Sequence, residues 1–319
     1  MHIKRKLMMA LMAVVLLCQV SCAAAMSFEP LPMDVSTGGP VPKDANYLSD
    51  TKYEDSSISV EIGTGRYADS EYHYAHIKLT HPSQLRTAPA GMVNSLSATF
   101  KSSATARGRL VANKVNAVVA INGDYYTKTD KCQVVMRMTN QVRNAARGDM
   151  DLLIIDKEGN FDAIKECTKE NYQDYYALHQ ERMYQVFCFG PVLVEQGESV
   201  IADDYRNGNV GSQNKTQRAG IAQLGELEYL LLTTAGPQSK NSKGVTIPEF
   251  AKLMETIGKE LSPTGCQLGF NLDGGNSTTL VFKTPRGTGN KLLYTKINSP
   301  EIERFLSDII YFSTLERDD

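Results

Sequence analysis

Short apolar runs rich in β-branched residues recur along most of this 319-residue chain, and polar or glycine-containing turns separate them. Runs of this length and composition are typical of buried β-strands, because β-branched side chains pack well on a pleated surface. They lie at 117–121, 152–156, 185–189, 192–195, 228–233, 268–272 and 278–282. So many strands constrain the fold strongly, because each one must find hydrogen-bonding neighbours in a sheet.

Residues 57–79 alternate between apolar and polar side chains around turn residues at 63–65, which predicts a β-hairpin. Two helices are expected, at 104–113 and at 247–257. The second has capping-box spacing between Thr246 and Glu249 and an apolar stripe at helical spacing behind it. Because strands outnumber helices and the helices are scattered among them, we expect an α+β fold in which a mixed β-sheet core carries helices packed on it.

The amino terminus predicts export. Residues 4–6 are basic, residues 7–17 are apolar, and three alanines at 23–25 provide a cleavage site, which together indicate a signal peptide over residues 1–25. The apolar run is shorter than the ~20 residues of a spanning helix, so no stable membrane span is expected. We therefore predict a secreted or cell-envelope protein. Lipoprotein anchoring through Cys22 is the alternative, although Gln19 stands where such sites have an aliphatic residue.

The mature chain is expected to be one large domain behind a tether. Residues 26–52 contain four prolines and Gly38-Gly39 without periodicity, and predict a linker with no fold of its own. The domain is expected over residues 53–315. Its charge is nearly balanced, with 34 basic and 36 acidic residues in the whole chain and a net charge of -2, which disfavours nucleic acid as a partner.

Motifs for common cofactors are missing from the sequence. It contains no P-loop, dinucleotide fingerprint, nucleophile elbow or zinc-protease helix, so no cofactor is expected. The four cysteines beyond the leader are widely separated and do not have metal-site spacing; they are Cys132, Cys167, Cys188 and Cys266. Disulfides and buried free thiols both remain open for them.

The strongest candidate site follows the apolar run 268–272. Asp273 is followed by Gly274-Gly275-Asn276-Ser277-Thr278, so that a carboxylate, two glycines, an amide and hydroxyl groups meet at a strand end. Glycines let a ligand approach the backbone, and the N–H groups of such a turn can hold an anion. A simple hairpin turn would explain Asp-Gly between two apolar strands equally well, and the residues alone do not separate the two readings.

Three other segments carry candidate residues. Asn122-Gly123-Asp124-Tyr125-Tyr126 repeats the same design at another strand end, and tyrosine rings suit sugar recognition, although a turn flanked by core aromatics is the simpler alternative. Phe189-Gly190-Pro191 is a third strand-end turn. Arg218, beside Ala219-Gly220 at the start of a strand, could clamp a phosphate with both guanidinium nitrogens, although most arginines are solvated.

In their order and spacing, these motifs resemble the phosphodiester glycosidase family over roughly residues 94–312. The motifs are Ala120 to Tyr126, Phe189-Gly190-Pro191-Val192-Leu193, Arg218-Ala219-Gly220-Ile221, the capped helix at 247–257 and Asn271 to Thr278. The resemblance implies a hydrolase that cleaves the glycosidic bond of a sugar-1-phosphodiester, of N-acetylglucosamine type or related, and releases sugar and a phosphomonoester. The expected partner is therefore a carbohydrate phosphodiester.

The resemblance also implies roles for individual residues. Asp273 would act as base or nucleophile and Arg218 would bind the phosphate. The residues that would orient the sugar and the water are Asn122, Asn276, Ser277 and Thr278, and those that would line the substrate site are Gly123, Asp124, Tyr125, Gly190, Gly274 and Gly275. Asp124 stands where the family commonly has glycine, and could be a turn residue, an added acid, or a ligand of calcium or magnesium together with Asp273. The turn residue is the preferred reading.

Two other functions are compatible with the same residues. The first is a noncatalytic cell-envelope protein that binds glycans or phosphoglycan polymers on this scaffold. The second is a phosphodiesterase that cleaves the phosphorus–oxygen bond instead of the glycosidic bond.

Overall fold

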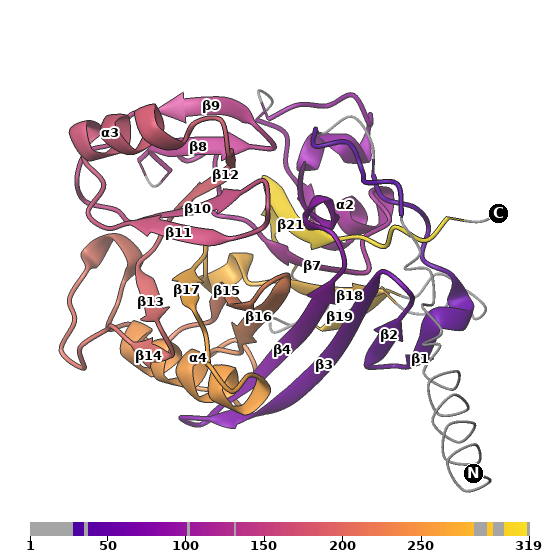
Figure 1. The fold of residues 1–319 in the computed structure, drawn as a ribbon. Helices are drawn as coiled ribbons and strands as arrows, with labels where there is room; N and C mark the ends of the chain where they lie inside the picture. Colours follow the sequence, from indigo (N-terminus) through magenta and orange to yellow (C-terminus); the bar gives the residue numbers. More distant parts are fainter. Residues whose placement is uncertain are drawn as a thin grey trace, which may run out of the picture.

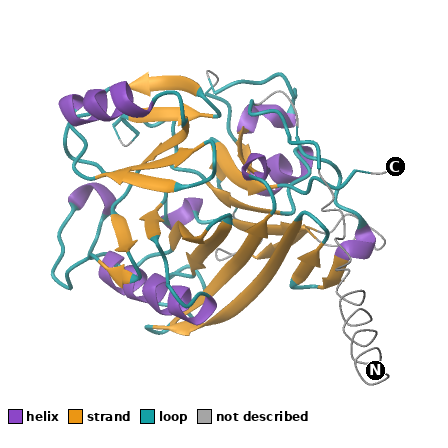
Figure 2. Ribbon diagram, viewed as in Figure 1, coloured by secondary structure: helices purple, strands orange, loops and turns teal. Residues whose placement is uncertain are grey.

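The computed structural model describes residues 28–34, 38–100, 103–130, 132–283, 292–295 and 303–317. Stacked β-sheets form the body of the protein, and the helices lie on the outside of the stack (Figures 1 and 2). Among the described residues, no helix is long and apolar enough to cross a membrane. The predicted signal peptide and Cys22 lie outside the described residues.

The largest sheet has nine strands in the order β1-β2-β3-β4-β16-β15-β17-β13-β14. Their bounds are β1 Tyr47–Ser49, β2 Lys52–Glu54, β3 Ile58–Tyr67, β4 Ser70–Leu79, β16 Glu228–Thr234, β15 Arg218–Gly225, β17 Leu268–Asn271, β13 Val192–Glu195 and β14 Glu198–Ser199. Helix α4 (Ile247–Leu261) packs its apolar stripe against the outer face of this sheet. The predicted capping box is present, since the Glu249 N–H donates to the Thr246 hydroxyl and the Thr246 N–H to the Glu249 carboxylate.

A second sheet has five strands in the order β19-β18-β7-β21-β5, and helix α2 (Gly108–Lys114) covers its outer face. The strands are β5 Leu85–Pro89, β7 Val119–Asn122, β18 Leu280–Lys283, β19 Leu292–Thr295 and β21 Asp308–Phe312, and a separate pair joins β6 Ala106–Arg107 to β20 Phe305–Leu306. The helix predicted at 104–113 is therefore shorter at its start, because residues 106–107 pair with β20 instead.

The third sheet also has five strands, in the order β11-β10-β12-β8-β9, and carries helix α3 (Lys169–His179), which the periodicity did not predict. Its strands are β8 Val134–Arg137, β9 Asn140–Asn144, β10 Leu152–Asp156, β11 Phe161–Ile164 and β12 Met183–Cys188. Tyr172 is the buried residue of α3, and it packs in an apolar cluster with β8, β10 and β12.

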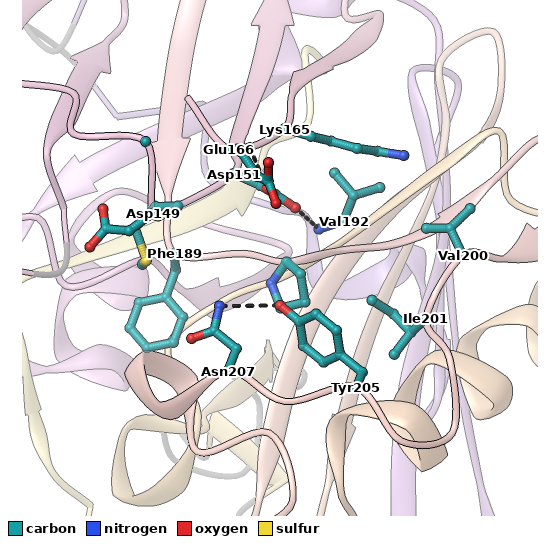
Figure 3. Close-up of a pocket in the computed structure, with 13 residues that line it drawn as sticks. Asp149, Asp151, Lys165, Glu166, Phe189, Val192, Val200, Ile201, Tyr205 and Asn207 are labelled. Atoms are coloured by element: carbon teal, nitrogen blue, oxygen red, sulfur yellow. Dashed lines mark hydrogen bonds between the residues drawn. The ribbon is translucent and has the colours of Figure 1, made fainter. Parts of the chain in front are cut away.

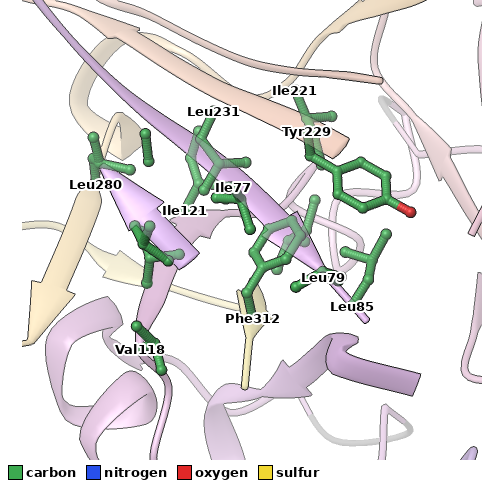
Figure 4. Close-up of a cluster of buried hydrophobic side chains, with 14 of the residues drawn as sticks. Ile77, Leu79, Leu85, Val118, Ile121, Ile221, Tyr229, Leu231, Leu280 and Phe312 are labelled. Carbon is green, nitrogen blue, oxygen red and sulfur yellow. The ribbon is translucent and has the colours of Figure 1, made fainter. Parts of the chain in front are cut away.

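The three sheets share one central hydrophobic core. Strand alternation explains how it forms: on β16, Tyr229 and Leu231 point into this core, whereas Leu230 and Leu232 point outward toward α4. Figure 4 shows part of the core, with Ile77 and Leu231 of the nine-stranded sheet close to Ile121 and Phe312 of the second sheet. The third sheet contributes Leu153, Ile155 and Phe187.

The predicted α+β class is confirmed, with one difference in the sheets. The pairings between the described strands are antiparallel, whereas a mixed sheet was predicted. The hairpin at 57–79 is also confirmed, as β3 and β4, but its predicted turn at 63–65 is wrong. The chain turns at Ala68 and Asp69, which both have positive φ. Gly63 lies within β3, where the Tyr74 ring of the neighbouring strand fills the space that a side chain would occupy.

The predicted linker is packed against the domain over much of its length. β1 lies within it and joins the nine-stranded sheet, so regular structure begins before residue 53. Leu31 is buried, and the Arg86 guanidinium donates to the carbonyls of Pro32 and Asp34. The sequence predicted a linker here because prolines and glycines are frequent and buried side chains are few. For the described part, the prediction that these residues have no fold of their own is corrected.

The four cysteines of the described residues are buried free thiols, which decides between the two possibilities left open by their spacing.

Candidate active site

The chain after β17 does not form a hairpin. β17 belongs to the nine-stranded sheet and β18 to the second sheet, so residues 272–279 carry the chain from one sheet to the other. The 3-10 turn η5 (Gly275–Ser277) lies in the middle of this crossing. Of the two readings of Asp273, the hairpin turn is therefore excluded, because the two flanking strands do not pair with each other.

Asn122 fastens the crossing to the end of β7. Its side-chain amide donates to the carbonyl of Asp273 at 2.7 Å, and its side-chain oxygen accepts the N–H of Thr279 at 3.0 Å. Asn122 is 1% exposed, whereas Asp273 is partly exposed. The sequence predicted both residues for one site, and the structure brings them together across 151 positions of the chain.

Glycines are required in this crossing by contact and by conformation. A Cβ atom on Gly274 would lie 2.7 Å from the carbonyl oxygen of Gln217, which real Cβ atoms do not tolerate. Gly275 has a φ of 57° in the left-handed region and donates its N–H to the same carbonyl at 2.8 Å. The two glycines thus press the turn against the start of β15 and fix the backbone next to Asp273.

A small cavity lies beside Asp273. Its volume is about 10 Å³, which is close to the space that a single water molecule requires. It is lined by Asn122, Gly123, Tyr125, Asp273, Ser277, Phe305, Leu306, Ser307 and Asp308. Five of these were predicted, namely Asn122, Gly123, Tyr125, Asp273 and Ser277, and the segment 305–308 was not.

Arg304 supplies a cation at the rim of this cavity. Its guanidinium donates to the Ser277 hydroxyl at 3.0 Å and to the Tyr125 hydroxyl at 3.4 Å, and lies 4.9 Å from the centre of the Tyr125 ring. Tyr125 has a φ of 62°, in the left-handed region that non-glycine residues rarely adopt. Arg304 is exposed, so its remaining N–H groups face solvent and are accessible to an anion.

Beneath the cavity is a buried group of charges. The Arg137 guanidinium lies between the carboxylates of Asp124, at 2.5 Å, and Asp308, at 3.2 Å, with its face 4.0 Å from the centre of the Phe187 ring. Asp124 also accepts the N–H of Cys188 at 2.8 Å. Asp124 is therefore neither a simple turn residue nor exposed to substrate, but half of a buried ion pair.

Burial has a clear effect on the acidity of these two carboxyl groups. It raises the pKa of both Asp124 and Asp308, against the opposing pull of Arg137, and the pKa of Asp308 reaches about 7. Asp124 and Asp308 flank the same guanidinium, and at a pKa of about 7 part of the Asp308 carboxyl group is protonated near neutral pH. Asp308 also restricts residue 123 to glycine, because a Cβ atom on Gly123 would lie 2.4 Å from Oδ1 of Asp308.

The position of Arg218 does not suit the binding of a substrate phosphate. It is 3% exposed, and its guanidinium donates to the backbone carbonyls of Val210, Gly211, Asn214 and Val245 at 2.8 to 3.2 Å. Burial without a carboxylate partner lowers the pKa of Arg218 to about 10. In this arrangement the arginine anchors the segment before β15.

The other predicted residues surround the crossing at different depths. Gly190 is buried and accepts a hydrogen bond from the Asn271 side chain at 2.7 Å, which ties its turn to the end of β17. Asn276 is exposed and accepts from Gln238 at 2.6 Å. The Thr278 hydroxyl is buried and has no hydrogen-bond partner among the described residues, so it can still bond to water or substrate.

The described residues contain no group of three His, Cys, Asp or Glu side chains that could hold a metal ion. Asp124 is engaged by Arg137 and the Cys188 N–H, which argues against its pairing with Asp273 around a cation.

The family model described as phosphodiester glycosidase matches residues 115–313, which is well over half of the chain. The chain belongs to the phosphodiester glycosidase family. The match contains the Asn122 and Asp273 segments as well as Arg137, Arg304 and Asp308. Among curated proteins, none matches the sequence.

Two solved structures share the phosphodiester glycosidase fold. The first is the catalytic domain of zebrafish N-acetylglucosamine-1-phosphodiester alpha-N-acetylglucosaminidase, described as auto-inhibited by its pro-peptide; it is 16% identical, with a TM-score of 0.58 over 88% of this chain and 87% of that one. The second is a hypothetical protein from Synechocystis, 13% identical, with a TM-score of 0.53 over 83% of this chain and 64% of that one. At these identities the likeness concerns the fold alone.

Besides residues 305–307 of the cavity lining, sequence reasoning missed three charged residues of the site, although two of these left a signal. Arg137 interrupts the apolar run Val134-Val135-Met136, and Asp308 directly precedes Ile309-Ile310. A charged side chain next to a buried apolar run requires a partner of opposite charge. Arg137 therefore predicts a buried carboxylate, and Asp308 predicts a buried cation. Arg304 lies in a polar stretch and gave no such signal.

Proposed function

We propose that this protein hydrolyses the glycosidic bond of a sugar-1-phosphodiester. The observation that carries the proposal is the position of Asp273, a partly exposed carboxylate beside a cavity of the size of one water molecule, on a crossing between two sheets. Membership of the phosphodiester glycosidase family supports a hydrolase of this type.

In the proposed reaction, Asp273 acts as a general base. It takes a proton from a water molecule held in the small cavity, and the resulting hydroxide attacks the anomeric carbon as the bond to the phosphate oxygen breaks. Asn122 fixes the backbone of Asp273, while Ser277 and Thr278 offer hydroxyl groups for orienting water and sugar. Because a phosphomonoester is a good leaving group, the reaction demands less acid assistance than ordinary glycoside hydrolysis.

Asp308 can supply what acid assistance is needed. Its pKa of about 7 keeps a large fraction protonated near neutrality, and it lines the same cavity as Asp273. A carboxylic acid and a carboxylate in one site are a common pair for acid and base roles.

We assign phosphate binding to Arg304 and not to Arg218. Arg304 is exposed at the rim of the cavity and held in place by Ser277 and Tyr125, whereas Arg218 donates to four backbone carbonyls inside the protein. An arginine fork oriented by its neighbours loses less freedom when it binds a phosphate.

The predicted leader places this activity outside the cytoplasm, either in the cell envelope or in the medium. The substrate would be a glycan or glycoconjugate with a phosphodiester at the anomeric carbon, of N-acetylglucosamine type or related. The reaction as proposed requires no cofactor, and addition of a chelator tests whether calcium or magnesium takes part.

Hydrolysis in ¹⁸O-labelled water tests the proposal. The substrate is a methyl phosphodiester of N-acetylglucosamine at the anomeric carbon, and the expected result is label in the released sugar and none in the phosphate. Label in the phosphate would instead establish a phosphodiesterase. If the protein binds the substrate but releases no product, it is a noncatalytic glycan-binding protein.

The Asp273→Asn variant, with folding checked by circular dichroism, is expected to lose ~10²- to 10⁴-fold in turnover. NMR of the first-formed sugar anomer tests the role of the residue, since a general base predicts inversion and a nucleophile predicts retention.

A further inference from the structure

A second cavity, of about 390 Å³, lies apart from the small cavity at Asp273, and no residue lines both. It is bordered by residues 148–151 and 165–166 on one side, and on the other by Phe189, Pro191 and Val192 with the segment 200–207 after β14. Its volume is within the range of small-molecule sites, about 300–1,000 Å³.

Hydrogen bonds within the protein hold the walls of this cavity in place. Asp151 joins two of them, because its carboxylate accepts the N–H of Glu166 at 2.9 Å and that of Val192 at 2.8 Å (Figure 3). The wall at 200–207 is held by Ser212, whose hydroxyl donates to the Tyr205 carbonyl and accepts the N–H of Asn207. Arg218 anchors the chain just after this wall, through hydrogen bonds to the carbonyls of Val210 and Gly211.

The lining divides into an apolar side and a polar side. Tyr205, Phe189 and Ile201 present rings and an aliphatic chain, and Figure 3 shows the Tyr205 and Phe189 rings on either side of the Asn207 amide. The Tyr205 hydroxyl accepts a hydrogen bond from Asn207 at 3.1 Å, so its own hydrogen can be donated to a ligand. This combination suits a pyranose ring, which has an apolar face and a rim of hydroxyl groups.

The charges of the lining limit the ligand further. Three carboxylates, from Asp149, Asp151 and Glu166, border the cavity, and the one lysine, Lys165, forms an ion pair with Glu195 at 2.5 Å. Carboxylates accept hydrogen bonds from hydroxyl and ammonium groups and repel phosphate and sulfate.

We propose that this cavity is a second carbohydrate-binding site, distinct from the candidate active site, that takes a neutral or amino sugar ring and rejects anionic sugars. Tyr205 and Asn207 bind the hydroxyl groups of the ring, and Glu166 favours an amino substituent. The proposal does not depend on hydrolysis at Asp273.

Three probes with the same ring and different charge test the site: glucosamine, N-acetylglucosamine and N-acetylglucosamine 6-phosphate. Binding to the purified full chain is followed by saturation-transfer NMR and calorimetry. We expect glucosamine to bind most tightly, N-acetylglucosamine next, and the phosphorylated sugar at least tenfold more weakly than N-acetylglucosamine. Equal or tighter binding of the phosphorylated sugar, or no saturable binding of any probe, overturns the proposal.

Variants locate the binding. Tyr205→Phe and Asn207→Ala are expected to weaken all binding at least fivefold, and Glu166→Gln to remove the preference for glucosamine over N-acetylglucosamine. The matched control is Tyr175→Phe, which removes a hydroxyl bonded to Asp162 outside the cavity and is expected to leave binding unchanged. Asp273→Asn separates the two sites: retained binding supports the proposal, whereas binding lost in this variant and kept in Tyr205→Phe assigns the sugar to the active site instead.

Discussion

Asp124 and Asp273 stand in segments that look alike in the sequence, each an aspartate beside glycine at the end of a buried strand, and the structure gives them opposite surroundings. Asp124 is fully buried against Arg137, whereas Asp273 is partly exposed beside a cavity. The difference lies in what covers each strand end: the third sheet closes over Asp124 through Cys188 and Arg137. One aspartate is therefore expected to matter for stability and the other for turnover.

The largest expected effect on stability is that of Asp124→Asn. The substitution leaves Arg137 with one carboxylate in a buried site, and breaking a buried ion pair costs about 3–5 kcal/mol. Urea unfolding measures the loss. Asp273→Asn is the matched control and is expected to change the free energy of unfolding by less than about 0.5 kcal/mol. Equal losses from the two variants would contradict the division of roles.

Gly123→Ala tests how closely the site packs on its buried charges. The added Cβ would lie 2.4 Å from Oδ1 of Asp308, and Arg137 holds that carboxylate in place, so we expect a loss of about 1–3 kcal/mol. Gly208→Ala provides the control, because a Cβ there has no neighbour within 4 Å. A Gly123→Ala variant as stable as this control would show that Asp308 can move.

Arg304→Gln sharpens the assignment of the phosphate site. We expect kcat/KM for the phosphodiester to fall about tenfold, or ~1.4 kcal/mol, because one charge-assisted contact is lost. With an aryl N-acetylglucosaminide, which has no phosphate, the loss is expected to disappear. Arg66→Gln, an exposed arginine on β3 whose guanidinium bonds to Glu71 and Asn241, serves as the control. A loss that is the same for both substrates argues against phosphate binding.

A pH dependence of stability is expected as well. Burial raises the pKa of Asp308 to about 7, above its unfolded value near 3.8, so the folded state holds a proton that the unfolded chain releases. The stability from this group is complete below about pH 4 and is lost as the pH rises toward 7, by on the order of 1 kcal/mol between pH 6 and 7. Asp308→Asn should remove this slope, which thermal unfolding across the range can measure.

Local patterns predicted most of the strands and the capped helix, because short-range periodicity and turn chemistry act within a few residues. The resemblance to the family, and not a local pattern, placed Asn122 and Asp273 in one site, since they lie 151 positions apart. The turn placed at Gly63 to Gly65 failed for a non-local reason, since tyrosine rings of the neighbouring strand occupy the space above those glycines. Arg218 was misplaced in a similar way. Its motif gave its position next to the site, but not that its side chain points toward backbone carbonyls.

The partners of Asp124 could not be read from its own segment. Arg137 and Asp308 lie 13 and 184 positions farther along the chain, and only the stacking of the second and third sheets places them together. The predicted linker was misread because its buried contacts, such as Leu31 and Tyr47, depend on grooves that the rest of the chain forms. Roles assigned through chemistry at Asp273 remain predictions for the experiments above.

The crossing from β17 to β18 also bears on how the protein is made. β4 pairs with β16, and in the site Asn122 bonds to Asp273 and Arg137 to Asp308, so several contacts that define the site join residues more than 140 positions apart. Chains of such high contact order fold slowly, because distant segments must meet before any contact rewards them. The site is therefore expected to assemble only after nearly the whole polypeptide has been delivered, and a chain truncated before β17 is expected to lack the proposed activity entirely.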